Sequence, residues 1–457
     1  MKLSNEIDMS RGALLPKLAL FIVPLMLTNV IQLTFHTVDL IVVGRFLGRD
    51  ALAAVGSNHA LILLFVCLLI GLTMGANVLA ARSFGAKNDE ELRRTIVTST
   101  LTIFLAGLLF ALLGIAFSTP LLTLLKVPDE IMPLAGLYLK IWFAGVPFIA
   151  LYNAAAAILR AVGDTRHPFY FLTISGLLNV GLNLLFVLVF HWGVAGVAIA
   201  TTLSETLACF LTLRFLTQTD AAYRLVFRGM KIDRKTLREL LYIGIPAALQ
   251  ESLFAISNMT IQGAVNTLGT IVMAGNSAGI SIESFVYVAQ DAVAQAALSS
   301  VSQNVGAREY QRTKRAVLDC TLLEIAVCSL LAFGMILFRR ELIGIYTDDP
   351  EALAAGELRL MILGSVYFLN GCMNMMPCAL RGYGFSLLPT AVTLLGICVF
   401  RVIWIATAFA AHPTLTVIYI SYPISWAVTA LTLYICYFIG RKGAFDRAVL
   451  SEKKMGE

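Results

Sequence analysis

The residue with the strongest case for chemistry is Asp39, a carboxylate in the first long apolar stretch of the 457-residue chain. It follows Pro24 by about fifteen residues of mostly Leu, Ile, Val, Phe and Thr, so a helix that crosses a bilayer would hold it below the membrane surface. An ionisable group at that depth is costly and is by default a candidate functional residue. The alternative is an acid near the helix mouth that only caps the helix or is solvated.

Two amides form a second candidate feature. Asn179 and Asn183 are four residues apart in an otherwise apolar run, so they share one face of a helix, and their amides need polar partners there. With Asp39 and either Thr201 or Thr202, they are predicted to form one polar cluster. Oxygens and amides suit a proton or Na⁺ and not a transition metal. The alternative is that the asparagines only join helices, which contributes roughly 0.6 to 2 kcal/mol.

The composition identifies the elements that must position these residues. The chain is 58% hydrophobic and 14% charged, with a mean hydropathy of +0.83, whereas soluble domains are about 25% charged. We therefore predict an all-α polytopic membrane protein whose helices each span about 20 apolar residues. Twelve are expected, near residues 15–43, 52–81, 95–119, 131–159, 168–190, 194–216, 236–266, 272–302, 316–338, 353–379, 387–411 and 414–439.

The distribution of Lys and Arg predicts the orientation. Most of the 34 basic residues fall in alternate loops, which places both termini in the cytoplasm and residues 339–352 outside. This topology also accounts for the net charge of +6, so a nucleic-acid partner is not indicated. We expect a monomer in the cell membrane that contacts lipid and binds a small molecule.

An internal repeat divides the chain into halves. At an offset of about 221 residues, several short stretches match one another. They include Leu47-Gly48 with Leu268-Gly269, Gly85-Ala86-Lys87 with Gly306-Ala307-Arg308, Gly163 with Gly384, and Pro168 with Pro389. The prediction is two six-helix bundles, 1–216 and 236–440, joined by a basic linker, 217–235, and followed by a tail, 441–457. Bundles related by an axis along the membrane normal are typical of alternating-access transporters.

The repeat also shows that the acid and the two amides of the first half have no acid or amide at the equivalent positions of the second half. At the same offset, within one residue, Asp39 corresponds to Thr260 and Asn179 to Phe400. Asn183 corresponds to Trp404. The polar cluster is therefore expected in the first half only.

Several segments together resemble the multidrug and toxic compound extrusion (MATE) family, over nearly the whole chain. They are Val38-Asp39 followed by Val43-Gly44, Gly85-Ala86, Leu159–Pro168 and Gly193–Thr201. The resemblance implies a twelve-helix secondary antiporter that exports amphipathic, often cationic compounds in exchange for H⁺ or Na⁺.

The resemblance is to the DinF-like branch, whose cation site lies in the N-terminal half. There the acid of the first helix matches Asp39, the amide of the fifth matches Asn179, and the threonine of the sixth matches Thr201. The fourth position is commonly Asp in that branch and is Asn183 here, which removes a negative charge and favours protons over Na⁺.

Other residues are secondary candidates. Glu251, five residues after Pro246, is a candidate second coupling or substrate carboxylate, although it precedes the position of the acid in other branches of the family. The alternative is an acid at a helix interface that pairs with a base of an inner loop. His36, one turn before Asp39, could relay protons. Aromatic and Met side chains suit promiscuous binding, yet such residues more often pack or face lipid. The substrate-contact candidates are Phe35, Trp142, Tyr152, Met259 and Met376.

Other classes of function are less favoured. A flippase for lipids or lipid-linked precursors shares this two-lobed architecture in related families, but those proteins tend to have a cationic central cavity. An enzyme is not expected, because the chain carries neither HExxH nor GxSxG, and its eight cysteines form no CxxC pair or zinc spacing. No cofactor is expected apart from the coupling ion. A channel would show flux without exchange.

Overall fold

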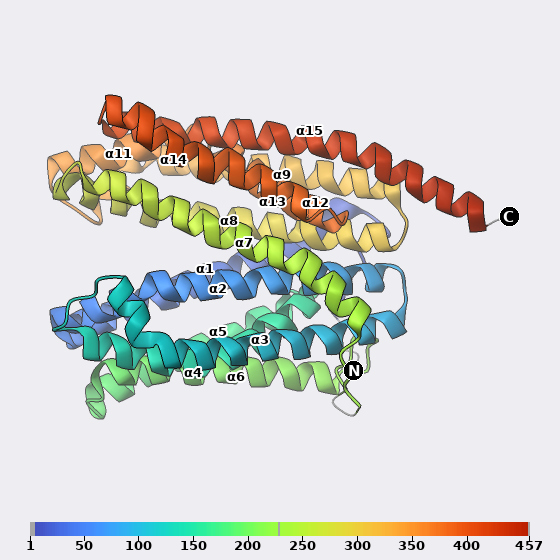
Figure 1. The fold of residues 1–457 in the computed structure, drawn as a ribbon, viewed down its shortest axis with the longest axis horizontal. Coiled ribbons are helices and arrows are strands. Elements are labelled where there is room, and N and C mark those ends of the chain that lie inside the picture. Colours follow the sequence, from blue (N-terminus) through green and yellow to red (C-terminus); the bar gives the residue numbers. More distant parts are fainter. Residues whose placement is uncertain (1–4, 227–228, 456–457) are drawn as a thin grey trace. The chain divides into compact units, whose positions relative to one another are not determined.

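A computed structural model describes residues 5–226 and 229–455, and the elements assigned within them are all helical. The all-α prediction is confirmed. Eleven helices are long and apolar enough to cross a membrane, and the span expected near 353–379 is a bent pair, which makes the twelfth. Figure 1 shows the helices and their labels.

The helices fall into two compact units. Of the described residues, those within 1–9 and 19–248 form unit 1, and those within 10–18 and 249–457 form unit 2. The boundary thus lies inside α7 (Arg234–Asn266), after the basic segment 217–235, of which residues 227–228 lie outside the described part. The helices before α7 are α1 (Leu14–Phe46), α2 (Gly48–Gly85), α3 (Asp89–Leu124), α4 (Met132–Ala161), α5 (Arg166–Leu184), the π-helix η1 (Leu185–Val189) and α6 (Gly193–Gln218).

Unit 2 contains the remaining elements, several of which are short. They are α8 (Thr270–Gly306), α9 (Tyr310–Leu337), α10 (Arg339–Gly344), α11 (Pro350–Gly364), α12 (Tyr367–Gly382), α13 (Leu387–Thr393), η2 (Leu394–Val399), α14 (Phe400–Trp404), η3 (Ile405–Phe409) and α15 (Leu415–Met455). The bend of 56° between α11 and α12 occurs at Gly364-Ser365, a pair of residues that commonly kinks helices.

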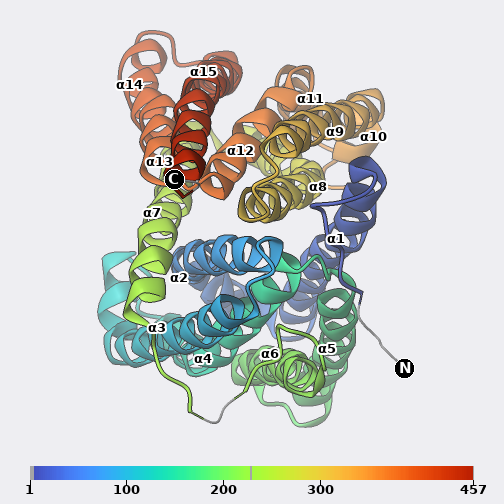
Figure 2. The same ribbon diagram turned by 90° about the vertical axis from the view of Figure 1, so that its right-hand side faces the viewer.

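The centre of unit 1 is α4, which packs against α2, α3 and α6 (Figure 2). Four consecutive alanines, 154–157, are fully buried on this helix. Small side chains let membrane helices approach closely, so van der Waals packing replaces the hydrophobic drive that lipid does not supply. In unit 2, α12 packs in the corresponding way against α8, α9 and α15.

The backbone repeats along with the sequence. The matched pairs Gly48 and Gly269, Lys87 and Arg308, and Gly163 and Gly384 all have positive φ angles, between 53° and 104°. The π-helix that ends the fifth span, η1, has its counterpart in η3. A non-glycine residue with positive φ is uncommon. Because this conformation occurs at both Lys87 and Arg308, the second helix of each half ends in the same way.

The predicted topology makes the connection between α10 and α11 accessible from outside the cell. Asp348 lies in this connection and is exposed. On a background without the eight native cysteines, Asp348→Cys should react with a membrane-impermeant maleimide added to intact cells. Protection of this position, with labelling only after the cells are opened, would overturn the topology. Arg94→Cys, an exposed position at the start of α3, should show the opposite pattern.

Candidate functional site

Three helices of unit 1 bring the predicted polar residues together. Asn183 of α5 donates from Nδ2 to a carboxylate oxygen of Asp39 on α1, and to the side-chain oxygen of Asn179, 3.2 Å away. Asn179 Nδ2 in turn donates to Thr201 Oγ1 of α6, at 3.5 Å. These bonds join four side chains into one hydrogen-bonded chain, the Asp39 cluster, which consists of Asp39, Asn183, Asn179 and Thr201.

The Asp39 cluster is built into the packed interior of unit 1. Asn183 is fully buried and Asn179 is 5% exposed, whereas Asp39 is half-buried. Asn183 Oδ1 has no hydrogen-bond partner among the described residues. Thr201 is oriented by its own bond to Val197 O at 3.1 Å. A buried amide oxygen without a partner is costly and leaves room for one further donor or cation.

Local sequence explains how α1 and α5 come so close. A Cβ atom on Gly176 would lie 1.6 Å from the ring of Phe35, so a larger residue there would require this ring to move. One and two turns further along α5, Asn179 and Asn183 lie on the same face. The close contact of α1 with α5 at Gly176 therefore accompanies the hydrogen bond from Asn183 to Asp39.

The partners of the Asp39 carboxylate in the cluster are neutral. Tyr138 of α4 is also close enough to interact electrostatically with it, a neighbour that sequence reasoning missed. A single carboxylate surrounded by amides and hydroxyls can be neutralised by a proton or a small monovalent cation. Among the described residues, no group of three His, Cys, Asp or Glu side chains could hold a metal ion.

Other candidates lie apart from this cluster. Thr202 donates to Ile141 O of α4, at 3.4 Å, and does not take part in the chain of bonds. His36 is exposed on α1. Glu251 is in unit 2, where it lines a cavity of about 20 Å³ together with Gln250 and Phe254.

The substrate-contact candidates do not share one environment. Trp142 and Tyr152 are buried in unit 1, and Met376 is fully buried in unit 2. Met259 of α7 is 52% exposed, and Phe35 packs against Gly176. The first three residues contribute to packing in this structure.

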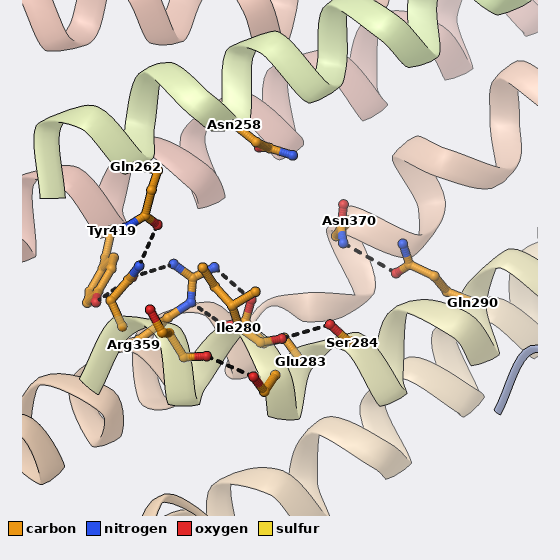
Figure 3. A network of polar contacts seen from close by, with 12 residues as sticks. Asn258, Gln262, Ile280, Glu283, Ser284, Gln290, Arg359, Asn370 and Tyr419 are labelled. Carbon is orange, nitrogen blue, oxygen red and sulfur yellow. Dashed lines mark hydrogen bonds and ion pairs between the residues drawn. The ribbon is translucent and has the colours of Figure 1, made fainter. Parts of the chain in front are cut away.

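Unit 2 contains a polar network that sequence reasoning missed (Figure 3). Arg359 of α11 donates from Nε and Nη2 to the two oxygens of Glu283 on α8, both at 2.8 Å, and from Nη1 to Asn276. Tyr419 donates to the same Asn276 oxygen. Arg359 is 4% exposed and therefore belongs to the interior of unit 2. The available signal was that Arg359 and Glu283 both lie within apolar spans.

A comparison between repeat-related positions tests whether the cluster is a site. Asn183→Leu removes both donors that reach Asp39 and Asn179, and should reduce gradient-driven transport about tenfold or more, since a charge-assisted hydrogen bond contributes about 1.5–3 kcal/mol. Trp404→Leu removes a bond to Val417 O and a ring contact with Phe400, and should leave ion coupling nearly intact. Transport by both variants is measured in liposomes after correct folding has been checked. Equal loss of coupling would mean that the asparagines only pack helices.

Comparison with known proteins agrees with the repeat. The MatE family model matches residues 24–185 and again residues 246–407. The two matches are equal in length, and one lies within each predicted half.

Similar proteins span almost the whole chain. A probable multidrug resistance protein, YoeA, of Bacillus subtilis (strain 168) is 29% identical over 96% of this chain and 97% of its own length. A probable multidrug resistance protein, NorM, of Thermotoga maritima is 26% identical, with 83% and 82% covered. An FAD transporter of Shewanella oneidensis is 27% identical, with 74% and 75% covered.

Solved structures share the fold. An outward-facing multidrug resistance MATE family transporter of the MOP superfamily superposes with a TM-score of 0.91 at 21% sequence identity. The match covers 98% of this chain and 100% of that one. At this identity the likeness establishes the architecture of the two bundles.

Proposed function

Because the chain belongs to the MatE family, we propose that it is a secondary antiporter that exports amphipathic compounds in exchange for H⁺ or Na⁺. The family match and the multidrug relatives support transport of drugs or toxic compounds by a multi-pass membrane protein. The observation that carries the exchange mechanism is the Asp39 cluster, in which an intramembrane carboxylate is bonded to Asn183.

In this mechanism Asp39 carries the coupling ion. A carboxylate that accepts a proton from one side of the membrane and releases it to the other ties each turnover to the ion gradient. Asn183 stabilises the ionised form by donating to it, and its second donated bond, to Asn179, holds the amide in place. Protonation of Asp39 removes the charged acceptor of Asn183. The arrangement of the cluster therefore differs between the two protonation states, which is what alternating access requires.

Protons fit the cluster better than Na⁺. Asp39 is its one carboxylate, and the other side chains are the amides of Asn179 and Asn183 and the hydroxyl of Thr201. Small hard cations are bound most tightly where several carboxylates or carbonyls converge. The assignment to the DinF-like branch, made from Asp39, Asn179 and Thr201, remains a prediction.

The proposed substrates are drugs, in line with the names of the multidrug relatives. Their small size and amphipathic character are expectations from the resemblance to the MATE family. We propose that the protein works as a monomer in the cell membrane with both termini in the cytoplasm. Apolar faces exposed along most helices fit a lipid surround.

The experiment that tests this function imposes one gradient at a time. In liposomes containing the purified protein, efflux of a fluorescent lipophilic cation should follow a pH gradient at zero Na⁺ gradient, and should respond weakly to a Na⁺ gradient at symmetric pH. Efflux driven only by Na⁺ would replace the proton with Na⁺ as the coupling ion. Efflux that ignores both gradients would refute antiport.

A further inference from the structure

Arg401 is a fully buried cation in the middle of a membrane span of unit 2. It lies on α14, a single short helix between the π-helices η2 and η3, and is 1% exposed. Its span, Leu387–Phe409, is otherwise uncharged. Local π-helical stretches in α-helices are frequent at functional sites.

The hydrogen-bond partners of Arg401 are neutral. Its Nη1 donates to Asn258 Oδ1 of α7 at 3.0 Å, and its Nε donates to Ser425 Oγ of α15 at 3.4 Å. The guanidinium lies 4.2 Å from the ring centre of Tyr422 and 5.8 Å from that of Phe254. The remaining nitrogen, Nη2, is buried and has no hydrogen-bond partner among the described residues.

Charge compensation separates Arg401 from the other buried arginines of unit 2. Arg359 is matched by the two oxygens of Glu283, and Arg381 lies close enough to Glu251 for their charges to interact. The ionisable groups that interact with Arg401 are Tyr422, Cys398 and Arg359 itself, none of them a carboxylate. The ring of Tyr422 contacts the guanidinium groups of both Arg359 and Arg401. The carboxylate of Glu283 accepts hydrogen bonds from Arg359 with both of its oxygens.

A buried positive charge without a counter-ion is unfavourable in a membrane, so this arrangement calls for an anion. The free Nη2 is a donor, and so is Nε1 of Trp426, which packs on Tyr422 and has no hydrogen-bond partner among the described residues. Groups that can only donate are satisfied by oxygen acceptors. We propose that Arg401 binds an oxyanion, a phosphate or carboxylate group carried by an amphiphilic ligand of this transporter.

This proposal rests on the proposed function and narrows its substrate class. It predicts that the substrates include amphiphiles with an anionic head group as well as cations. Phe254 lies between the two places, because its ring contacts the guanidinium and the residue also lines the small cavity beside Glu251.

The test measures binding of octyl phosphate to the purified full-length protein in a neutral maltoside detergent. Binding is read as the rise in unfolding temperature, followed with a thiol dye that reacts as the buried cysteines become exposed. Wild type should be stabilised by octyl phosphate. Arg401→Gln should bind it about 10- to 100-fold more weakly, as expected for loss of a charge-assisted hydrogen bond. Octyltrimethylammonium measures the response to the same tail with a cationic head.

Matched variants separate the site from general charge effects. Arg340→Gln changes an exposed arginine of α10 and should bind octyl phosphate like wild type. Trp426→Phe removes one donor and should weaken binding severalfold. If Arg401→Gln does not fold, Arg401→Lys keeps the charge on a different geometry and should bind more weakly than wild type. Equal binding by wild type and the folded Arg401 variant would overturn the proposal.

Two further measurements identify the source of the oxyanion and test the anion site independently of the proposed antiport. Phosphatidic acid added to the micelles should block octyl phosphate if the natural ligand is a lipid head group, and should leave it unaffected if the ligand is a free amphiphile. Asp39→Asn should bind octyl phosphate normally, since Asp39 belongs to the other unit. Normal binding with no gradient-driven efflux in wild type would refute the antiporter and retain the anion site.

Discussion

Asp39→Asn should insert and fold like wild type but lose gradient-driven efflux. The substitution keeps the shape of the side chain and its place beside Asn183, while it removes the only carboxyl group of the cluster. Binding of the transported compound does not require that change, so the variant should still bind the drug. Efflux from liposomes under an imposed pH gradient should fall to the level of protein-free vesicles.

The size of the loss follows from the energy that one proton supplies. A proton that moves down a potential of about 100 mV releases about 2.3 kcal/mol, which sustains roughly a fifty-fold gradient of a neutral compound. Without a titrating group that energy is unavailable, and the variant should at most equilibrate its substrate. Accumulation against a gradient is therefore the quantity to measure.

A second acid serves as the control for Asp39. Asp129 is exposed in the connection between α3 and α4, and Asp129→Asn should pump like wild type. If Asp39→Asn pumps at the wild-type rate under a pH gradient, then Asp39 is not the coupling group. Glu251 would then become the next candidate, because its carboxyl lines a cavity in unit 2.

Arg359→Met should produce the largest loss of stability. It leaves Glu283, whose side chain is 10% exposed, without the guanidinium that satisfies both of its oxygens. Removing one partner of a buried ion pair typically costs about 3–5 kcal/mol, because the remaining charge is left uncompensated. The free energy of unfolding in neutral detergent should decrease by about that amount.

A double substitution shows whether the lost stability comes from the charge of Glu283, which Arg359→Met leaves without a partner. Glu283→Gln combined with Arg359→Met removes both charges and should recover most of the free energy of unfolding that the single Arg359 substitution loses. A single variant as stable as wild type would show that water or a cation replaces the arginine. Arg339→Met, which breaks a looser pair with Glu357 at 3.8 Å, should have little effect.

The architecture was predictable from the sequence because a bilayer requires long apolar helices and the repeat shows itself as matched short motifs. The Asp39 cluster was predictable for a related reason, since polar side chains buried among apolar ones must find each other. The spacing of Asn179 and Asn183 placed them on one face of α5, where the structure has them.

The remaining features depend on partners that are distant in sequence. Thr201 and Thr202 could not be ranked, because neighbouring residues face different directions and only the packing of α6 on α4 and α5 decides which one meets Asn179. The ion pair of Arg359 could not be predicted, because its partner Glu283 lies 76 residues away on another helix. The bend at Gly364-Ser365 was missed because an apolar run looks the same whether it is straight or kinked.

The most direct test of coupling by Asp39 runs the exchange in reverse. Liposomes with wild-type protein, at symmetric pH and without Na⁺, receive an inward gradient of a fluorescent lipophilic cation, and a trapped dye reports the pH of the lumen. Entry of the cation should drive protons out, so the lumen should become alkaline with wild-type protein and remain unchanged with Asp39→Asn. Entry of the cation through wild-type protein without any change in luminal pH would contradict proton antiport.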